Sequence, residues 1–419
     1  MPVPTAFVIS RPTASGLRRA RGVNTHTALR EPLAADDTRP ELSVVVPTFR
    51  EAGNVDALVQ RIFAATRGAG ISAEVVVVDD DSRDGIDERC AALARRYPVR
   101  LITRTGERGL ATAVIRGCEE ATGRFIACMD ADLSHPPEAL PAMVRALSDG
   151  ADFVVGSRYV PGGSVDDGWS AARRLNSRVA TALAAPLTRV RDPLAGFFAL
   201  PRHRWPAAGT LAPLGYKIGL ELLVKTRPAT VSEIPIRFAD RHVGESKLDL
   251  RVQLQYLRHL ARLYRFRQPL LVEMVLFVLV GSLGLALDVA VYAGLQRLFG
   301  LHHLVARAVS FVVAATHNWY LNRRVTFDTG RSRPATAQWA SYLALMMAGF
   351  TVNVGTYALL TTQAGFGGRA RYAALVIGVL AGTAVNFTTS RALVFAARRV
   401  RRGPADAAQP VERAPDVAA

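Results

Sequence analysis

The chain has 419 residues, carries 52 Lys+Arg against 35 Asp+Glu for a net charge of +17, and is half hydrophobic. This composition excludes a disordered tail and a small disulfide-bonded scaffold, and the length allows two or three domains. The positive charge leaves two classes of partner open, a nucleic acid or a membrane surface.

The distribution of the charge along the chain favours the membrane. Residues 241–402 hold 20 basic and 5 acidic residues, a net charge of +15, whereas residues 1–240 hold 31 and 27. Basic clusters between long apolar runs are typical of membrane proteins, whereas a nucleic-acid binder needs them on a soluble face. We therefore expect a lipid bilayer as a partner and no nucleic acid.

The N-terminal part of the chain is consistent with a reducing, cytoplasmic location. Residues 1–40 are rich in Arg, Pro, Thr and Ala and contain no apolar run long enough for a secretory signal, so we expect a flexible arm. Cys90, Cys118 and Cys128 show no metal-binding spacing, and we expect them to be buried, reduced thiols.

Residues 41–248 predict an α/β domain with a mostly parallel, doubly wound sheet. Short β-branched runs alternate there with amphipathic helical patterns, which is typical of strands buried on both faces between helices. Residues 160–240 are less regular, with a turn at 192–198 and a further strand at 231–238. The expected strands are 42–49, 73–80, 99–104, 124–132 and 152–159, and the expected helices are 54–68, 87–97, 109–123 and 136–150.

Polar residues cluster where three of the expected strands end, and this is the edge at which ligands bind in such sheets. Asp130 and Asp132 form a D-x-D pattern after a buried strand, and two hard oxygen ligands suit Mg²⁺ or Mn²⁺ held together with substrate phosphates. A lone D-x-D is also common on protein surfaces, but here a helix start follows it directly. Residues 79–82 end another strand with three carboxylates that can accept hydrogen bonds from a nucleotide or shape a local turn.

Seven motifs in this part of the chain resemble, in order, those of the dolichol-phosphate mannose synthases among the GT-A family 2 glycosyltransferases. The resemblance runs from about residue 41 to 250 and implies transfer of a hexose from a nucleotide sugar to a polyprenyl phosphate. The motifs are PTFRE (47–51), VDDDS (78–82), DADLSHPP (130–137), GSRY (156–159), DPLAGFF (192–198), GYKIGLE (215–221) and DRHVGESK (240–247).

The resemblance also implies site residues. It places Asp130, Asp132 and Ser134 at the metal, with Ala131 beside them. The residues implied to line the nucleotide are Pro47, Phe49, Glu51, Val78 and Asp80, and those implied to contact donor or lipid phosphates are Arg158, Arg241 and Lys247.

Two positions depart from the family pattern, and one residue type is unusually rare. Phe49 stands where Tyr is expected, which removes a hydroxyl, and Arg50 stands where Asn is expected. The chain contains only three lysines, Lys217, Lys225 and Lys247. A lysine in the GESK segment of an arginine-rich protein favours a site that prefers a compact point charge to a planar guanidinium.

The C-terminal half predicts a helical membrane domain over residues 269–397, followed by a basic and then disordered tail over 398–419. An amphipathic helix at 249–268 precedes it, and we interpret this helix as interfacial, with a core helix of the soluble domain as the alternative. Arginines gather before the first span, between the second and third, and after the fourth, so the positive-inside rule places both termini and the soluble domain in the cytoplasm. The four expected spans are 270–295, 305–321, 342–360 and 372–389.

The membrane part repeats itself. Asn318-Trp319, Arg323 and Phe327 form a pattern that recurs as Asn386-Phe387, Arg391 and Phe395, and Asp288 and Tyr292 match Asn353 and Tyr357. The offsets of 68 and 65 residues predict two tandem helix pairs of the same orientation. The signature and the number of spans resemble the GtrA-like membrane proteins. Polar residues inside the spans either bond neighbouring helices or line a path for a headgroup or a proton.

The leading hypothesis is therefore a metal-dependent, inverting glycosyltransferase of the cytoplasmic membrane face, with mannose from GDP-mannose and a polyprenyl or dolichyl phosphate as substrates. The acceptor phosphate has a second pKa of about 6, so it is a nucleophile without a general base. The alternatives are a UDP-glucose-dependent polyprenyl-phosphate glucosyltransferase, and a lipid-linked sugar transport or anchoring module. A processive polysaccharide synthase is disfavoured because the nearest match to its Q-x-x-R-W segment, residues 201–205, lacks the Gln.

Overall fold

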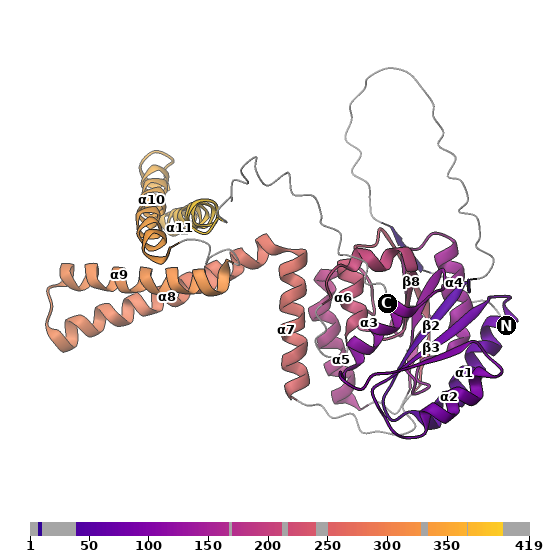
Figure 1. Ribbon diagram of the computed structural model, residues 1–419. Helices are drawn as coiled ribbons and strands as arrows, with labels where there is room; N and C mark the ends of the chain where they lie inside the picture. Colours follow the sequence, from indigo (N-terminus) through magenta and orange to yellow (C-terminus); the bar gives the residue numbers. More distant parts are fainter. Residues whose placement is uncertain are drawn as a thin grey trace, which may run out of the picture. The chain divides into compact units, whose positions relative to one another are not determined.

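The structure is a computed structural model that describes residues 7–10, 39–166, 170–211, 217–239, 250–327, 334–366 and 368–396. It divides into two compact units, residues 1–267 and 268–419 (Figure 1). Most of the expected N-terminal arm and the expected C-terminal tail lie outside the described residues.

The first unit is built on an eight-stranded sheet in the order β1-β9-β6-β8-β5-β2-β3-β4. β2, β3, β4 and β5 pair in parallel, as do β6 and β9, so the predicted mostly parallel sheet is confirmed. A small parallel pair, β7 (Ser164–Val165) with β10 (Arg237–Phe238), lies apart from it. The strands of the large sheet are β1 (Phe7–Ser10), β2 (Leu42–Thr48), β3 (Ala73–Asp79), β4 (Val99–Thr103), β5 (Phe125–Cys128), β6 (Phe153–Ser157), β8 (Phe198–Pro201) and β9 (Thr230–Pro235).

Helices cover both faces of the sheet, as predicted for a doubly wound domain (Figure 1). One face packs against α1, α2 and α4, and the other packs against α3 and α6. The helices of this unit are α1 (Ala52–Gly68), α2 (Ile86–Ala94), α3 (Leu110–Glu120), α4 (Leu140–Ser148), α5 (Ala171–Ala184), α6 (Ile218–Lys225) and α7 (Leu250–Arg267), with short 3₁₀ turns η1 (Pro137–Ala139), η2 (Ala185–Leu187) and η3 (Arg202–Ala208).

Two strands of the large sheet were not expected from the sequence. β8 lies antiparallel between β5 and β6; it has four buried residues, too few for a recognisable alternation, and it follows the expected turn at 192–198. β1 falls within the segment expected to be a flexible arm and pairs antiparallel with β9, from Phe7 opposite Glu233 to Ser10 opposite Thr230. The expectation of an arm is therefore wrong for residues 7–10, where backbone pairing to the edge of the sheet forms a strand.

The parallel register brings the polar strand ends together. Thr48 at the end of β2 pairs with Asp79 at the end of β3, and Val45 of β2 pairs with Cys128 at the end of β5. The loops after these three strands therefore lie at one edge of the sheet, where doubly wound folds bind their ligands.

All three cysteines are buried in this unit, as expected. Cys118 and Cys128 lie in the same apolar cluster, and Cys90 packs on the opposite face. Burial raises the pKa of each thiol, to about 11 for Cys90, so none of the three is a reactive thiolate near neutral pH.

Helix α7 packs against other helices of the first unit. This packing agrees with the alternative interpretation of residues 249–268 as a core helix. Leu260 and Leu263 are buried against residues of α5, η2 and α6, and the Tyr256 hydroxyl donates to the Ala180 carbonyl at 2.6 Å. The leucines of this amphipathic helix therefore differ in burial, because Leu254 and Leu257 remain about half exposed. Contact with lipid through that exposed side stays a prediction.

The described residues of the second unit form four long helices, α8 (Pro269–Phe299), α9 (His303–Leu321), α10 (Ala335–Thr362) and α11 (Ala370–Thr389), with π-helical turns η4 (Asn322–Thr326) and η5 (Ser390–Val394). Three segments within the described residues are long and apolar enough to cross a membrane: Pro269–Phe299, Ala335–Thr362 and Ala370–Val394. The expected second span is the helix α9, which falls outside this set because Arg307, His317 and Asn318 reduce its apolarity.

Corresponding residues of the two halves make corresponding contacts, which supports the predicted repeat. Helices pair as α8 with α9 and as α10 with α11. Two hydrogen bonds also join the halves: Arg391 donates to Glu273 of α8 at 2.5 Å, and Arg323 donates to Gln338 of α10 at 2.5 Å. The rings of Phe327 and Phe395 stack with centroids 4.6 Å apart between the halves.

Candidate functional site

A cavity of about 320 Å³ lies at the carboxyl ends of the strands of the first unit. Its polar wall combines carboxylates with an arginine and a lysine, so the cavity can receive both a cation and an anion. The lining residues are Pro47, Thr48, Phe49, Glu51, Asp80, Leu110, Ala113, Asp130, Ala131, Asp132, His135, Gly156, Arg158, Leu194, Ala195, Gly196, Lys217, Ile236 and Phe238.

The structure brings most of the expected site residues together around this cavity. Those that line it are Pro47, Phe49, Glu51, Asp80, Asp130, Ala131, Asp132 and Arg158. Val78 does not line it, because its side chain is fully buried beside Val76 and Ala113. Arg241 and Lys247 lie outside the described residues.

The two carboxylates of the D-x-D pattern differ in exposure. The side chain of Asp130 is 28% exposed, whereas Asp132 is buried. Ser134 holds Asp132 in place, since its backbone N–H and its hydroxyl donate to Oδ1 of Asp132 at 3.1 and 2.5 Å. Leu133 between them has φ 61°, a left-handed conformation that turns the loop sharply and is uncommon outside glycine. Ser134 thus orients the carboxylate of Asp132.

The surroundings of Asp130 fit a divalent cation. A Cβ added to Gly196 would lie 3.4 Å from one carboxylate oxygen of Asp130 and 3.5 Å from the other, so the glycine leaves open the space beside that carboxylate. One or two carboxylates with an open side suit Mg²⁺ or Mn²⁺, which complete their shell with water and substrate phosphates.

His135 supports this loop as a structural group. Its Nδ1 accepts the backbone N–H of Asp130 at 3.1 Å, and its ring packs between Phe197 and Phe238. Burial lowers the pKa of His135, although Asp130 opposes the shift, so the imidazole is neutral near pH 7.

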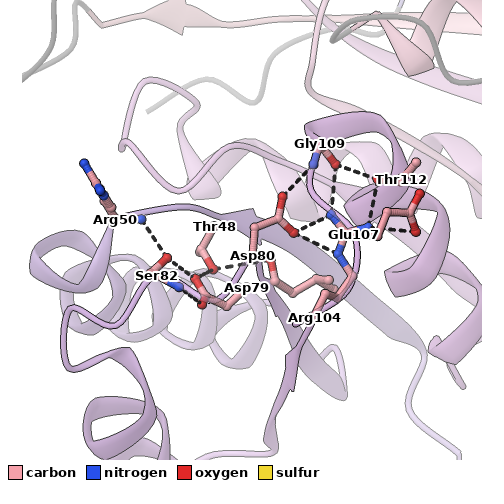
Figure 2. A network of polar contacts seen from close by, with 10 residues as sticks. Thr48, Arg50, Asp79, Asp80, Ser82, Arg104, Glu107, Gly109 and Thr112 are labelled. Carbon is pink, nitrogen blue, oxygen red and sulfur yellow. Dashed lines mark hydrogen bonds and ion pairs between the residues drawn. The ribbon is translucent and has the colours of Figure 1, made fainter.

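A buried ion pair fixes Asp80 at the edge of the cavity (Figure 2). Arg104 donates to Oδ1 of Asp80 through Nε at 2.8 Å and also through Nη2, and the backbone N–H of Gly109 donates to Oδ2 at 2.7 Å. Arg104 also donates to the hydroxyl of Thr112 at 2.8 Å. Both charged side chains are 8% exposed. Asp80 is therefore held in one orientation by groups from the loop before α3.

Asp79 plays a different part from Asp80 (Figure 2). Its Oδ1 accepts the Thr48 hydroxyl at 3.0 Å, and its Oδ2 accepts the backbone N–H of Ser82 at 2.8 Å. The Ser82 hydroxyl in turn accepts the backbone N–H of Arg50 at 2.8 Å. These bonds join the loops after β2 and β3, so Asp79 shapes the turn while Asp80 faces the cavity.

Arg50, which stands where the family pattern has Asn, adopts an unusual backbone conformation. Arg50 has φ 60°, in the left-handed region that Asn adopts more readily than Arg. Its guanidinium lies 5.3 Å from the ring centre of Phe49, the other departure, and that of Arg108 lies 5.5 Å away. The exposed ring that replaces the expected tyrosine thus carries two cationic neighbours.

We expect Arg50→Asn to stabilise the protein, because Asn relieves part of the left-handed strain that costs about 1 kcal/mol. The midpoint temperature of thermal unfolding of the full chain should then rise by about 2 °C. Arg50→Ala is the matched control, since it removes the same guanidinium but keeps the strain. An equal shift in both variants would show that the guanidinium, and not the backbone, is responsible.

Arg158 is held at the opposite wall by Asp192. Two guanidinium nitrogens donate to the two oxygens of Asp192 at 2.7 and 2.8 Å, and the backbone N–H of Arg158 donates to Oδ2 at 3.0 Å. Burial alone would lower the pKa of Arg158, but the bonds and charge of the fully buried Asp192 outweigh it and raise the pKa. The cavity therefore carries a permanent positive charge in a fixed orientation.

Sequence reasoning gave no role to several residues of this site. Lys217 lines the cavity and donates to the Leu194 carbonyl at 3.2 Å; its rarity and its place in GYKIGLE were available signals. Asp192 belongs to the DPLAGFF motif, but its pairing with Arg158 is visible only in three dimensions. Arg104 lies outside every motif, and no pattern in the sequence marks it.

Two family models match the chain, one in each unit. Residues 43–201 match the model described as glycosyl transferase family 2, and residues 276–395 match the model described as GtrA/DPMS, transmembrane domain.

Two relatives with the same printed name match the chain over different lengths. The chain is 35% identical over 363 residues to a dolichol-phosphate mannosyltransferase of Pyrococcus furiosus, which covers 85% of this chain and 99% of the relative. It is 45% identical over 256 residues to a dolichol-phosphate mannosyltransferase of Mycosarcoma maydis, covering 59% of this chain and 86% of the relative. Among solved structures, a glucosyl-3-phosphoglycerate synthase of Mycobacterium tuberculosis in complex with Mn²⁺, UDP and glucosyl-3-phosphoglycerate is 19% identical, with a TM-score of 0.40, over 54% of this chain and 80% of that one.

Proposed function

Since the chain belongs to the dolichol-phosphate mannosyltransferases, glycosyltransferases of family 2 that here carry a GtrA-like membrane domain, we propose that it transfers mannose from GDP-mannose to a polyprenyl or dolichyl phosphate. The observation that carries this proposal is that Asp130, Asp132, Arg158 and Lys217 line the same cavity. A nucleotide sugar needs both kinds of charge, because its diphosphate binds a metal and leaves as an anion.

Asp130 and Asp132 would hold Mg²⁺ or Mn²⁺, and the bound metal would neutralise the departing nucleoside diphosphate. Arg158, kept in place by Asp192, supplies a second positive charge that needs no reorganisation during the reaction. Lys217 adds a third at the same cavity. By resemblance, Arg241 and Lys247 complete the phosphate-binding set.

Asp80 and the residues after β2 would bind the nucleotide. Pro47, Phe49 and Glu51 line the same cavity as Asp80, whose carboxylate is already oriented by Arg104. An oriented carboxylate accepts hydrogen bonds from a base or ribose without first losing rotamer freedom. We therefore assign this wall to the nucleotide and the wall of Arg158 to the phosphates.

The acceptor needs no general base. A phosphate monoester is largely a dianion near neutral pH, because its second pKa is about 6. His135, the histidine of the cavity, is buried, and its Nδ1 is used as an acceptor. These groups support our proposal of a direct attack of the acceptor phosphate on the anomeric carbon, with inversion and departure of the nucleoside diphosphate.

We further propose that all four helices of the second unit cross the membrane and that the first unit and both termini are cytoplasmic. The helix α9 pairs with α8 as α11 pairs with α10, and α11 lies in a candidate span. The arginine-rich ends Arg265, Arg323 and Arg391 then fall on one side, in agreement with the positive-inside rule.

The assay offers the full-length protein GDP-mannose or UDP-glucose together with citronellyl phosphate and Mg²⁺ or Mn²⁺. We expect mannosyl transfer from GDP-mannose and a β-linked product by NMR. Glucosyl transfer from UDP-glucose would reassign the donor, and an α-linked product would exclude inversion. The absence of lipid product with either donor would leave the transport or anchoring module as the alternative.

A further inference from the structure

An irregular segment, the loop of residues 188–197, forms part of the wall of the catalytic cavity. These residues contain no helix or strand, and three of them, Leu194, Ala195 and Gly196, line the cavity. A segment outside helices and sheets must find partners for its backbone polar groups elsewhere, so its position depends on contacts with the surrounding structure. The contacts that hold this loop therefore also fix that wall of the cavity.

The loop in turn holds Arg158 and Lys217, two cations of the cavity. Asp192 accepts hydrogen bonds from two guanidinium nitrogens of Arg158, at 2.7 and 2.8 Å. The backbone carbonyl of Leu194 accepts a hydrogen bond from the ammonium group of Lys217 at 3.2 Å. Because both cations bind to the same loop, a shift of the loop would displace both charges.

Glu233 of β9 anchors this loop to the sheet. Its side chain belongs to a residue that is 1% exposed. Its Oε1 accepts the backbone N–H of Asp192 at 3.1 Å, and its Oε2 accepts the backbone N–H of Arg191 at 2.9 Å. These two hydrogen bonds, which we call the Glu233 clamp, hold two consecutive peptide groups of the loop on one carboxylate.

The strand that carries Glu233 is a firm support, because β9 lies between β1 and β6 in the sheet. Glu233 pairs with Phe7 of β1 and with Val155 of β6. A glutamate is rarely buried so completely unless its oxygens have partners, and an apolar residue would suit a strand with neighbours on both sides. The two N–H groups of the loop explain the carboxylate, since it offers an acceptor oxygen to each of them and a carboxamide does not.

We propose that Glu233 is a positioning residue for the transfer reaction, and that it sets the places of Arg158 and Lys217 through the loop of residues 188–197. This inference rests on the proposed function, in which these cations stabilise the departing nucleoside diphosphate. Charges that stabilise a transition state must be in place before the reaction, and a displacement of about 1 Å can lower a rate about 10²-fold. Glu233 itself is not among the residues that line the cavity, so its effect reaches the substrate only through the loop.

The variant Glu233→Gln tests the clamp in the full-length protein. It keeps the shape of the side chain but replaces one acceptor oxygen by an NH₂ group that faces a backbone N–H. With the donor that the unmodified protein uses, we expect kcat to fall about tenfold, because the cations lose their fixed positions. The KM for the donor should change less than about threefold, since the opposite wall with Asp80 is held by Arg104. Hydrogen exchange of residues 188–197, followed by mass spectrometry, should become faster.

Glu74→Gln is the matched control. Glu74 is also a buried strand glutamate, 7% exposed, and it accepts the backbone N–H of Thr122 at 2.9 Å and the hydroxyl of Ser43 at 2.6 Å. It lies at the start of β3, at the edge of the sheet opposite to the cavity. The control should lower the midpoint temperature of thermal unfolding but leave kcat and the exchange of residues 188–197 unchanged. An equal fall of kcat in both variants would overturn the proposal, because lost stability would then explain it.

A second variant, Glu233→Asp, tests whether both acceptor oxygens matter. It keeps two carboxylate oxygens on a side chain that is shorter by one methylene. Its kcat and its exchange over residues 188–197 should lie between those of the unmodified protein and those of Glu233→Gln. A kcat below that of Glu233→Gln would contradict a role that depends on two acceptors.

The two measurements separate the steps of the proposal. Faster exchange with an unchanged kcat in Glu233→Gln would overturn the role of the clamp in transfer, and a lower kcat with unchanged exchange would overturn the route through the loop. Exchange needs no substrate, so it also tests the clamp in a protein that transfers no hexose. Absence of transfer by the unmodified protein would contradict the proposed function, whereas normal transfer by Glu233→Gln would contradict the positioning role only.

Discussion

Replacing Asp130 or Asp132 by Asn should lower hexosyl transfer about 10²- to 10³-fold, the usual effect of removing one group that stabilises developing charge. Asn preserves the shape of the side chain and can still accept the hydrogen bonds that Ser134 donates to Asp132. The charge that we propose to bind the metal is lost, however. Transfer from GDP-mannose and Mn²⁺ binding, followed by electron paramagnetic resonance, should therefore fall together.

Asp149→Asn is the control for this prediction, because Asp149 is an exposed carboxylate at the end of α4. It should leave transfer and Mn²⁺ binding unchanged. If Asp130→Asn kept full transfer while losing Mn²⁺ binding, the metal would have no part in the reaction. If it kept both, the D-x-D carboxylates would not be the metal ligands.

Replacing Arg104 by Leu should destabilise the first unit by about 3–5 kcal/mol, because it leaves the buried carboxylate of Asp80 without its counter-charge. The orientation of Asp80 is lost at the same time, so we expect a higher KM for the nucleotide sugar in the protein that remains folded. Arg104→Lys keeps the charge but loses the guanidinium contacts to Asp80 and Thr112. Compared with Arg104→Leu, it should restore most of the stability but less of the donor KM. Thermal unfolding and donor titration measure the two effects.

The pair of Arg61 with Glu138 provides the control. Arg61 also donates through Nε and Nη2, here to the two oxygens of Glu138 at 3.0 and 2.9 Å, but the two side chains are 41% and 57% exposed. Arg61→Leu should therefore cost about 1 kcal/mol or less and leave KM unchanged. Equal losses for Arg61→Leu and Arg104→Leu would mean that burial does not set the cost. An unchanged KM in Arg104→Leu would show that Arg104 stabilises the fold but does not affect donor binding.

The alternating sheet and helices could be predicted from the sequence because strands buried on both faces form unbroken β-branched runs, as Val75 to Val78 do in β3. Such runs identify strands but not their partners. The antiparallel insertion of β8 depends on contacts with β5 and β6, and the pairing of β1 depends on the edge of β9. Both are long-range properties that a local pattern does not contain.

The site was predictable to the extent that its residues lie in contiguous motifs. Asp130 and Asp132 follow one strand, and their chemistry is local to the loop. Asp80 was recognised, but Arg104, which orients it, comes from the end of a different strand 24 residues away. Val78 was included through its neighbours in the VDDDS motif, although it lies within β3, which is buried on both faces, so its side chain packs in the core.

The crossed contacts between the halves of the membrane unit have a consequence for its assembly. Arg391 donates to Glu273, and Arg323 donates to Gln338, so each helix pair supplies a polar partner to the other. In thermodynamic terms the unit is a dimer of two helix pairs, and the connection through residues 328–333 raises their effective concentration. Two separately expressed helix pairs should still associate in a bilayer, through these polar contacts and the stacking of Phe327 on Phe395.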